Sequence, residues 1–148
     1  IRDSPSRLIF GKHLPKSEYL ARYRVADLFL DTHPYNAGTT ASDALRMGLP
    51  VLTYLGSSAV SRHAASVINA LNLPELIAAT EEEYEKLAIE LATDSEKLKN
   101  IKDKLVGNLP IAPLYDTPMF TRHLESAYLT MHDRYQRDLD PDHIYVKH

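Results

Sequence analysis

The sequence predicts an α/β protein in which helices flank a parallel sheet, and two observations support this class. Residues 26–30 and 51–54 are short and mainly apolar, as is typical of parallel strands that helices cover on both faces. Segments with helical spacing of apolar residues lie between and after them. Since only about three or four strands can be identified, we expect the chain to be part of a larger α/β domain.

Local signals predict the N-terminal elements in order. Residues 7–11 are a strand candidate, and residues 15–25 a helix whose proline takes a tolerated first-turn position. After the strand at 26–30, a loop with turn residues leads into a helix that Thr39 and Thr40 open and Gly48 ends. The strand at 51–54 precedes a helix over residues 60–71.

The C-terminal half is predicted to be helical. Thr80 and Glu83 form a capping box before an apolar stripe. A further helix ends at Gly107, and Thr117-Pro118 begins a long last helix. We therefore divide the chain into one partial domain, residues 1–137, and a polar C-terminal tail, residues 138–148.

Composition narrows the function classes. The chain has 148 residues, no cysteine and a net charge of −3, which indicates one domain without disulfides and gives no support for a nucleic-acid surface. No apolar stretch is long enough for a membrane span, and no signal-peptide pattern is found. We therefore expect a cytoplasmic protein that binds neither nucleic acid nor membrane.

The loop DTHPYNAGTTASDAL, residues 31–45, connects a strand to a helix. The first N–H groups of a helix have no partner inside it, and the helix dipole adds about half a positive charge there. The hydroxyl groups of Thr39 and Thr40 can donate to the same anion, and Asp43 shares their face of the helix. This pattern favours a nucleotide diphosphate, with the carboxylate near ribose hydroxyl groups.

A simpler interpretation stays open for this loop. Thr39 or Thr40 could be an ordinary N-cap, and Asp43 a first-turn acid that suits the dipole. The loop has neither the Gly-x-Gly-x-x-Gly fingerprint nor the Gly-Lys-Ser/Thr of phosphate loops. Spacing alone therefore does not decide between the two interpretations.

The helix over residues 15–25 carries a second group of candidates. Lys16, Tyr19 and Arg22 recur at intervals of three and share one face. This face is either a solvated surface or part of a binding site.

No metal site is expected. The seven histidines include no His-x-x-x-His pair. Asp138-Leu139-Asp140 has an Asp-x-Asp spacing, but it lies in the polar tail, where solvated carboxylates are the better interpretation. We expect neither a metal ion nor another cofactor.

Residues 30–54, LDTHPYNAGTTASDALRMGLPVLTY, resemble the donor-binding segment of the nucleocytoplasmic O-GlcNAc transferases, a family with SPINDLY-type and bacterial members. Residues 7–24, RLIFGKHLPKSEYLARYR, resemble the preceding strand and helix of that family. Residues 61–66, SRHAAS, resemble its next helix, and residues 113–135 resemble its closing helix. The likeness spans nearly the whole chain in the order of the family.

The resemblance implies the GT-B arrangement, in which two Rossmann-like halves face a cleft. This chain matches the later part of the C-terminal half. The family's N-terminal half, its tetratricopeptide repeats, its pyrophosphate-binding lysine and the histidine proposed near the acceptor hydroxyl have no match here. We therefore expect glycosyltransferase activity of the full-length protein, no catalytic residue in this chain, and no activity of this chain alone.

The resemblance also implies residue roles at the nucleoside. Leu14 would give backbone contacts to the uracil ring, Lys16 a polar or charged contact, and Tyr19 a stacking platform where animal enzymes have histidine. Asp43 would bind the ribose.

At the diphosphate, Thr39 and Thr40 would stabilise the leaving group. Gly38 keeps the backbone of this phosphate cradle but lacks the histidine side chain that animal enzymes have there. Arg62 and His63 could face the cleft, although an arginine at this place could equally pair with surface acids.

The implied function is inverting, metal-independent transfer of GlcNAc from UDP-GlcNAc to serine or threonine of a protein acceptor. Two alternatives stay open: a SPINDLY-type O-fucosyltransferase that uses GDP-fucose, and a non-catalytic nucleotide-binding or interaction module. Apolar surface left bare by absent strands would favour a homodimer of this chain.

Overall fold

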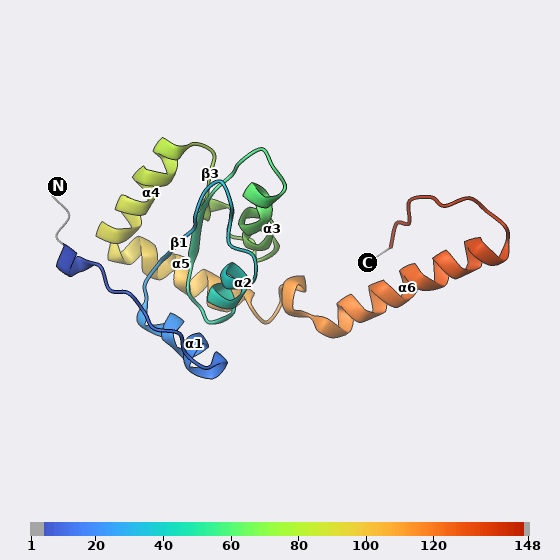
Figure 1. Ribbon diagram of the computed structural model, residues 1–148, viewed down its shortest axis with the longest axis horizontal. Helices are drawn as coiled ribbons and strands as arrows, with labels where there is room; N and C mark the ends of the chain where they lie inside the picture. The colour runs from blue at the N-terminus through green and yellow to red at the C-terminus, as the bar shows by residue number, and fades with distance from the viewer. Residues whose placement is uncertain (1–4, 147–148) are drawn as a thin grey trace.

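A three-stranded parallel sheet in the order β1-β2-β3 forms the centre of the fold (Figure 1). The computed structural model describes residues 5–146, so the first four and last two residues of the expected units lie outside the described residues. The strands are β1 (Phe29–Leu30), β2 (Val51–Tyr54) and β3 (Ile77–Ala78). Their parallel pairing confirms the predicted α/β class.

Helices cover and follow the sheet. The α-helices are α1 (Lys16–Arg22), α2 (Thr39–Arg46), α3 (His63–Ala70), α4 (Glu81–Thr93), α5 (Ser95–Asn108) and α6 (Thr117–Gln136). The 3-10 turns are η1 (Pro5–Arg7), η2 (Tyr23–Val25), η3 (Val60–Arg62), η4 (Pro74–Leu76) and η5 (Pro113–Tyr115). The helices expected at 15–25 and 60–71 each divide into an α-helix and a 3-10 turn, and α5 continues one residue past Gly107.

The strand expected at residues 7–11 does not form. Residues 8–15 have no regular secondary structure, and Leu8, Ile9 and Phe10 are 65%, 92% and 90% exposed. A strand needs a neighbour for its backbone hydrogen bonds, and no strand in the described part of the chain pairs with this segment. The apolar composition of the segment was therefore an insufficient basis for the prediction.

The two outer strands of the sheet, β1 and β3, are only two residues long. β1 covers only the last two residues of the expected 26–30 strand, because only its end bonds to β2: the N–H of Phe29 donates to Pro50 at 2.9 Å. β3 was not predicted, since two residues directly after a proline turn carry no strand pattern of their own.

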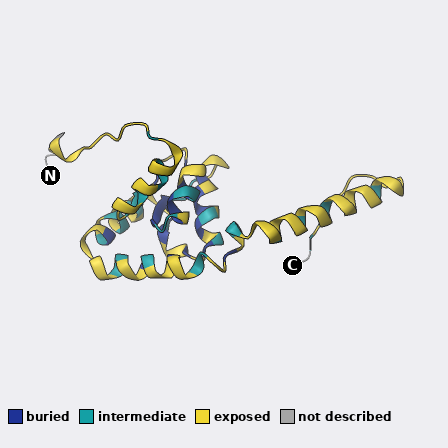
Figure 2. Cartoon of the chain, turned by 90° about the horizontal axis from the view of Figure 1, so that it is seen from below, coloured by how far each residue is buried: buried dark blue, intermediate teal, exposed yellow. Residues whose placement is uncertain are grey.

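The core lies between the sheet and helices α2, α3, α4 and α5, and Figure 2 shows the buried residues gathered there. Fully buried side chains include Leu45 of α2, Val51 of β2, Ile68 of α3, Leu91 of α4 and Leu105 of α5. These contacts fix α2 against the sheet, and α2 carries most of the candidate phosphate site.

Helix α2 ends as the sequence predicts. Met47 is its C-cap, and Gly48 follows with a φ of +81°, in the left-handed region that glycine adopts without a steric cost. Near the middle of the helix, the hydroxyl of Tyr115 donates to the carbonyl of Ser42 at 2.8 Å. Burial raises the pKa of the Tyr115 hydroxyl above its ordinary value.

Helix α6 leaves the α/β body and extends away from it (Figure 1). It begins at the predicted Thr117-Pro118, and none of its residues is buried. The following tail turns back toward it, where a guanidinium nitrogen of Arg134 donates to the carbonyl of Asp140 at 2.5 Å. No helix among the described residues is long and apolar enough to cross a membrane.

We expect Tyr115→Phe to lower the free energy of unfolding by about 1 kcal/mol, because it removes one partly buried hydrogen bond and little apolar area. Urea unfolding of the chain measures this difference. The matched control is Tyr135→Phe, since Tyr135 is 78% exposed and should tolerate loss of its hydroxyl. Equal stability of the two variants would show that the Tyr115 bond does not hold α2.

Candidate functional site

Asp31 organises the loop that leads into α2. The residue is only 7% exposed, and Oδ1 accepts from the N–H groups of Thr32 at 2.9 Å and Ala37 at 2.7 Å. Oδ2 accepts from the hydroxyl of Thr53 at 2.7 Å. The carbonyl of Asp31 accepts from the hydroxyl of Tyr84 at 2.8 Å. One residue thus joins β1 to β2, to α4 and to the chain just before α2.

The N-terminus of α2 presents unpaired donors. Gly38 is the N-cap, with no side-chain cap hydrogen bond, and its carbonyl accepts from the N–H of Ser42 at 3.1 Å. Within residues 5–146, the N–H groups of Thr39, Thr40 and Ala41 donate to no acceptor. These donors and the positive end of the helix dipole suit an anion.

The simpler interpretation is wrong about the N-cap and about the place of the acid. Thr39 and Thr40 are the first two residues of the helix and not its N-cap. Asp43 is not in the first turn either.

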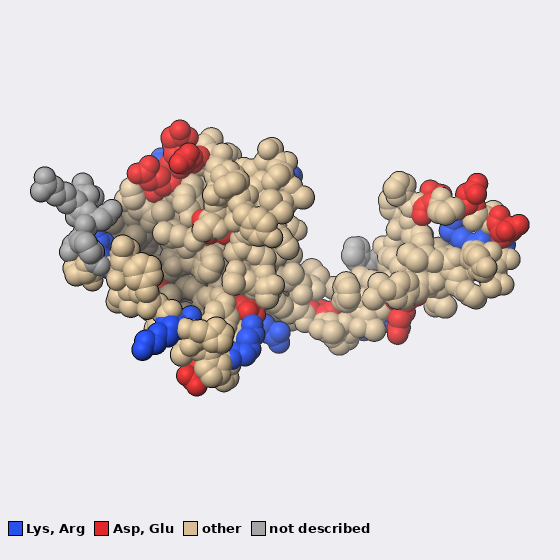
Figure 3. All heavy atoms as spheres, in the orientation of Figure 1, with Lys and Arg blue, Asp and Glu red and all other residues tan. Residues whose placement is uncertain are grey.

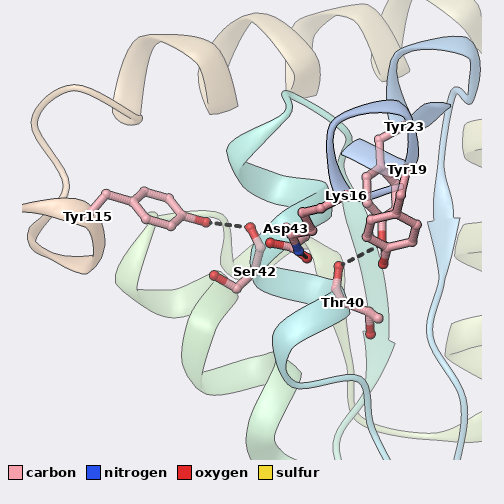
Figure 4. Close-up of polar contacts among 7 residues, drawn as sticks. All are labelled: Lys16, Tyr19, Tyr23, Thr40, Ser42, Asp43 and Tyr115. Atoms are coloured by element: carbon pink, nitrogen blue, oxygen red, sulfur yellow. Dashed lines mark hydrogen bonds and ion pairs between the residues drawn. The ribbon is translucent and has the colours of Figure 1, made fainter. Parts of the chain in front are cut away.

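Asp43 and Lys16 come together although they are 27 positions apart. Lys16 Nζ lies 2.5 Å from Asp43 Oδ2, and the two side chains are 62% and 20% exposed (Figure 4). Asp43 Oδ1 accepts no hydrogen bond within the described part of the chain. The fold thus joins the predicted nucleoside face of α1 to the predicted ribose residue of α2.

A hollow of about 450 Å³ lies beside this ion pair. Leu14, Lys16 and Tyr19 all line it, as do Lys12 and Arg22. Its lining holds no carboxylate, and Figure 3 shows lysine and arginine side chains gathered at the α1 end of the molecule. The structure therefore brings the three predicted nucleoside residues into one basic pocket.

Two tyrosines connect this pocket to α2. The Tyr19 and Tyr23 rings pack edge to face, with centroids 5.2 Å apart. The two hydroxyl groups are in contact, and the Tyr23 hydroxyl donates to the carbonyl of Thr40 at 3.4 Å (Figure 4). In the contact between the two hydroxyl groups, either oxygen can be the donor. Burial and the hydrogen bond shared with the Tyr19 hydroxyl raise the pKa of the Tyr23 hydroxyl above its ordinary value.

Cations also lie over the Tyr19 ring. Lys16 Nζ is 5.2 Å and Arg22 Cζ is 5.8 Å from the ring centroid. These contacts and the hydroxyl chain fix the orientation of the ring. Its stacking on a base stays a prediction.

His63 places an imidazole at the start of α2. A Cβ atom on Gly38 would lie 3.1 Å from Cε1 of His63 and 3.3 Å from its Nδ1. The N–H of Asn36 donates to the carbonyl of Val60 at 3.1 Å, which ties the loop to the turn before His63. Neighbouring Arg62 is exposed, and no ion pair of it occurs within the described residues.

Sequence reasoning missed several of these features. Asp31 was treated only as the end of a strand, and Tyr23, Tyr84 and Tyr115 as apolar or unassigned positions. An aspartate directly after an apolar strand was a usable signal for Asp31. The three tyrosines bond to partners 17, 53 and 73 positions away, respectively, so no local pattern indicates their roles.

No group of three or more His, Asp or Glu side chains is placed to hold a metal ion within the described residues. In the tail, the carboxylate of Asp142 lies 3.8 Å from the guanidinium of Arg134.

The chain is similar to one family of glycosyltransferases both in sequence and in structure. The profile of Glycosyl transferase family 41 matches residues 3–124. A UDP-N-acetylglucosamine--peptide N-acetylglucosaminyltransferase of Caenorhabditis elegans is 36% identical over 140 residues, which cover 95% of this chain and 12% of the relative. A probable enzyme of the same name, SPINDLY of Petunia hybrida, is 37% identical over 118 residues, which cover 80% of this chain and 13% of the relative.

Among solved structures, a mutant of the Thermobaculum terrenum O-GlcNAc transferase matches with a TM-score of 0.73 and 36% sequence identity. The match covers 80% of this chain and 23% of that one. This chain thus spans only about an eighth of the curated relatives, 12% and 13%, and has the Rossmann-like fold of part of a GT-B glycosyltransferase. The profile match over most of its length shows that the chain belongs to glycosyltransferase family 41.

Proposed function

We propose that this chain is the nucleotide-sugar-binding part of an inverting, metal-independent protein O-glycosyltransferase. Its donor is UDP-GlcNAc, and its acceptor is a serine or threonine of a protein. The observation that supports this proposal best is the N-terminus of α2, where the exposed residues Thr39 and Thr40 carry unpaired N–H groups near the Lys16–Asp43 pair and the basic pocket. The names of the relatives support the choice of donor and acceptor.

Each part of the site has a role in this proposal. The uracil occupies the pocket, with contacts to the backbone of Leu14, to Lys16 and to the Tyr19 ring. Asp43 Oδ1 accepts from a ribose hydroxyl. The diphosphate lies at Gly38, Thr39 and Thr40, where N–H groups, threonine hydroxyl groups and the helix dipole hold it without a metal ion or cofactor.

The reaction follows from this placement. An acceptor hydroxyl attacks the anomeric carbon, the bond to the diphosphate breaks, and the nucleoside diphosphate leaves. Negative charge grows on the departing phosphate oxygen atoms in the transition state, and fixed N–H dipoles stabilise this charge more than they stabilise the bound donor. We assign no general base to this chain, and we expect this chain alone to transfer no sugar.

Calorimetric titration of UDP and GDP into the full-length protein tests the proposal. We expect UDP to bind in the presence of EDTA, GDP to bind at least tenfold more weakly, and radiolabelled GlcNAc to pass from UDP-GlcNAc to a serine-containing peptide. This chain alone should bind UDP more weakly than the full-length protein.

The other outcomes identify the alternatives. Selective GDP binding and fucose transfer would support the fucosyltransferase. UDP binding without transfer would support a non-catalytic nucleotide-binding module, and no binding of either nucleotide would leave an interaction module. Cytoplasmic location and a homodimer of this chain stay predictions that cell fractionation and light scattering would check.

A further inference from the structure

The imidazole of His63 is held against the start of α2 by the fold. His63 is the first residue of α3, and Ala64, Ala65 and Ile68 of the same helix are buried in the core. Nδ1, Cε1 and Nε2 of the ring lie 3.3, 3.1 and 3.8 Å from the position that a Cβ atom on Gly38 would take. The ring therefore fills the space where a side chain at residue 38 would begin.

In this position the ring nitrogen atoms have no bonding partner among the described residues. Within the described residues, the ring of His63 forms no hydrogen bond or ion pair, and the residue is exposed. A histidine keeps at least one ring N–H donor in either protonation state. The unpaired N–H groups of Thr39 and Thr40 belong to the next residues along the chain from Gly38. A ring donor and backbone donors thus converge on one end of α2.

We propose that His63 binds the diphosphate of the nucleotide-sugar donor at the N-terminus of α2, and that Gly38 leaves the space which the ring needs. The inference rests on the proposed function, because it assigns a further residue to the same donor site. A hydrogen bond from the ring to a phosphate oxygen is stronger than one between neutral groups, since the acceptor is charged.

Four variants of the full-length protein test this proposal by UDP calorimetry. His63→Phe keeps a flat ring of similar size but removes its donors. We therefore expect UDP to bind about tenfold more weakly, which corresponds to about 1.4 kcal/mol of binding free energy. His63→Gln restores an N–H donor and should recover part of this affinity. Melting temperatures close to that of the unmodified protein would show that each variant folds.

The second part of the test changes Gly38, alone and together with His63. The Cβ atom of Gly38→Ala would lie 3.1 Å from the ring, so the exposed ring must move by a few tenths of an ångström. We expect UDP affinity to fall about threefold in Gly38→Ala. Because a phenyl ring has no N–H donor, we expect Gly38→Ala to cause no further fall when it is added to His63→Phe.

The outcomes separate this inference from the proposed function. If the unmodified protein binds UDP and His63→Phe binds it equally well, the His63 assignment is overturned and the donor site stands. If Gly38→Ala weakens binding equally with histidine and with phenylalanine at position 63, Gly38 acts independently of the ring and that part is overturned. If the unmodified protein binds neither UDP nor GDP, the proposed function and this inference both fail.

Discussion

Asp31→Ala should lower the free energy of unfolding by about 3 kcal/mol and remove measurable UDP binding. The substitution leaves the buried hydroxyl of Thr53 and the part-buried N–H groups of Thr32 and Ala37 without their acceptor. Each hydrogen bond to a charged group contributes about 1.5–3 kcal/mol, and relaxation of the exposed side recovers part of the loss. Because Ala37 precedes the N-cap of α2, the loop that positions the phosphate cradle loses its anchor. Urea unfolding and UDP calorimetry measure the two effects.

Thr53→Val is the matched control for this prediction. It removes only the Oδ2 partner of Asp31 and keeps the side-chain volume, so we expect a loss of about 1.5 kcal/mol and near-normal UDP binding. If Asp31→Ala were no less stable than Thr53→Val, the two backbone bonds to Oδ1 would contribute nothing, and the anchoring role of Asp31 would be wrong.

The elements that were predicted correctly are determined by residues close together in the sequence. Thr80 accepts from the N–H of Glu83 at 3.1 Å, and Glu83 returns by accepting from the N–H of Ala79 at 2.7 Å, so the capping box was visible within five residues. Gly48 ends α2 through its own positive φ. The strand at Val51–Tyr54 is the central one, and complete burial of Val51 and Leu52 explains its apolar start.

The features that sequence missed depend on distant parts of the chain. Residues 7–11 were predicted as a strand from their composition, but strand formation depends on a partner that their own sequence does not specify. The contact of His63 with Gly38 joins positions 25 apart, and its existence depends on the packing of α3 beside α2. Among the candidate residues, Leu14, Lys16, Tyr19 and Asp43 were assigned to the nucleoside through a family resemblance, since spacing alone favoured a solvated face for the helix that carries Lys16 and Tyr19.

Asp43→Ala should weaken UDP binding to the full-length protein about 100-fold. A carboxylate that accepts from ribose hydroxyl groups contributes about 1.5–3 kcal/mol for each bond, and 2.7 kcal/mol corresponds to a factor of about 100. The same substitution should change the unfolding free energy little, because the Lys16–Asp43 pair is largely exposed on the lysine side and such pairs contribute about 0–1 kcal/mol. Calorimetry and urea unfolding distinguish the two effects.

The ribose role of Asp43 is separated from its ion pair by changing the ligand as well as the residue. If Asp43 Oδ1 binds the ribose, the unmodified protein should prefer UDP to 2′-deoxy-UDP or 3′-deoxy-UDP, and Asp43→Ala should lose that preference. Lys16→Met serves as the matched control, because it removes the partner of Oδ2 but leaves Oδ1 in place, so the preference should persist at lower overall affinity. A preference that survives in Asp43→Ala would assign ribose recognition to another residue and leave Asp43 only the task of holding Lys16 beside the pocket.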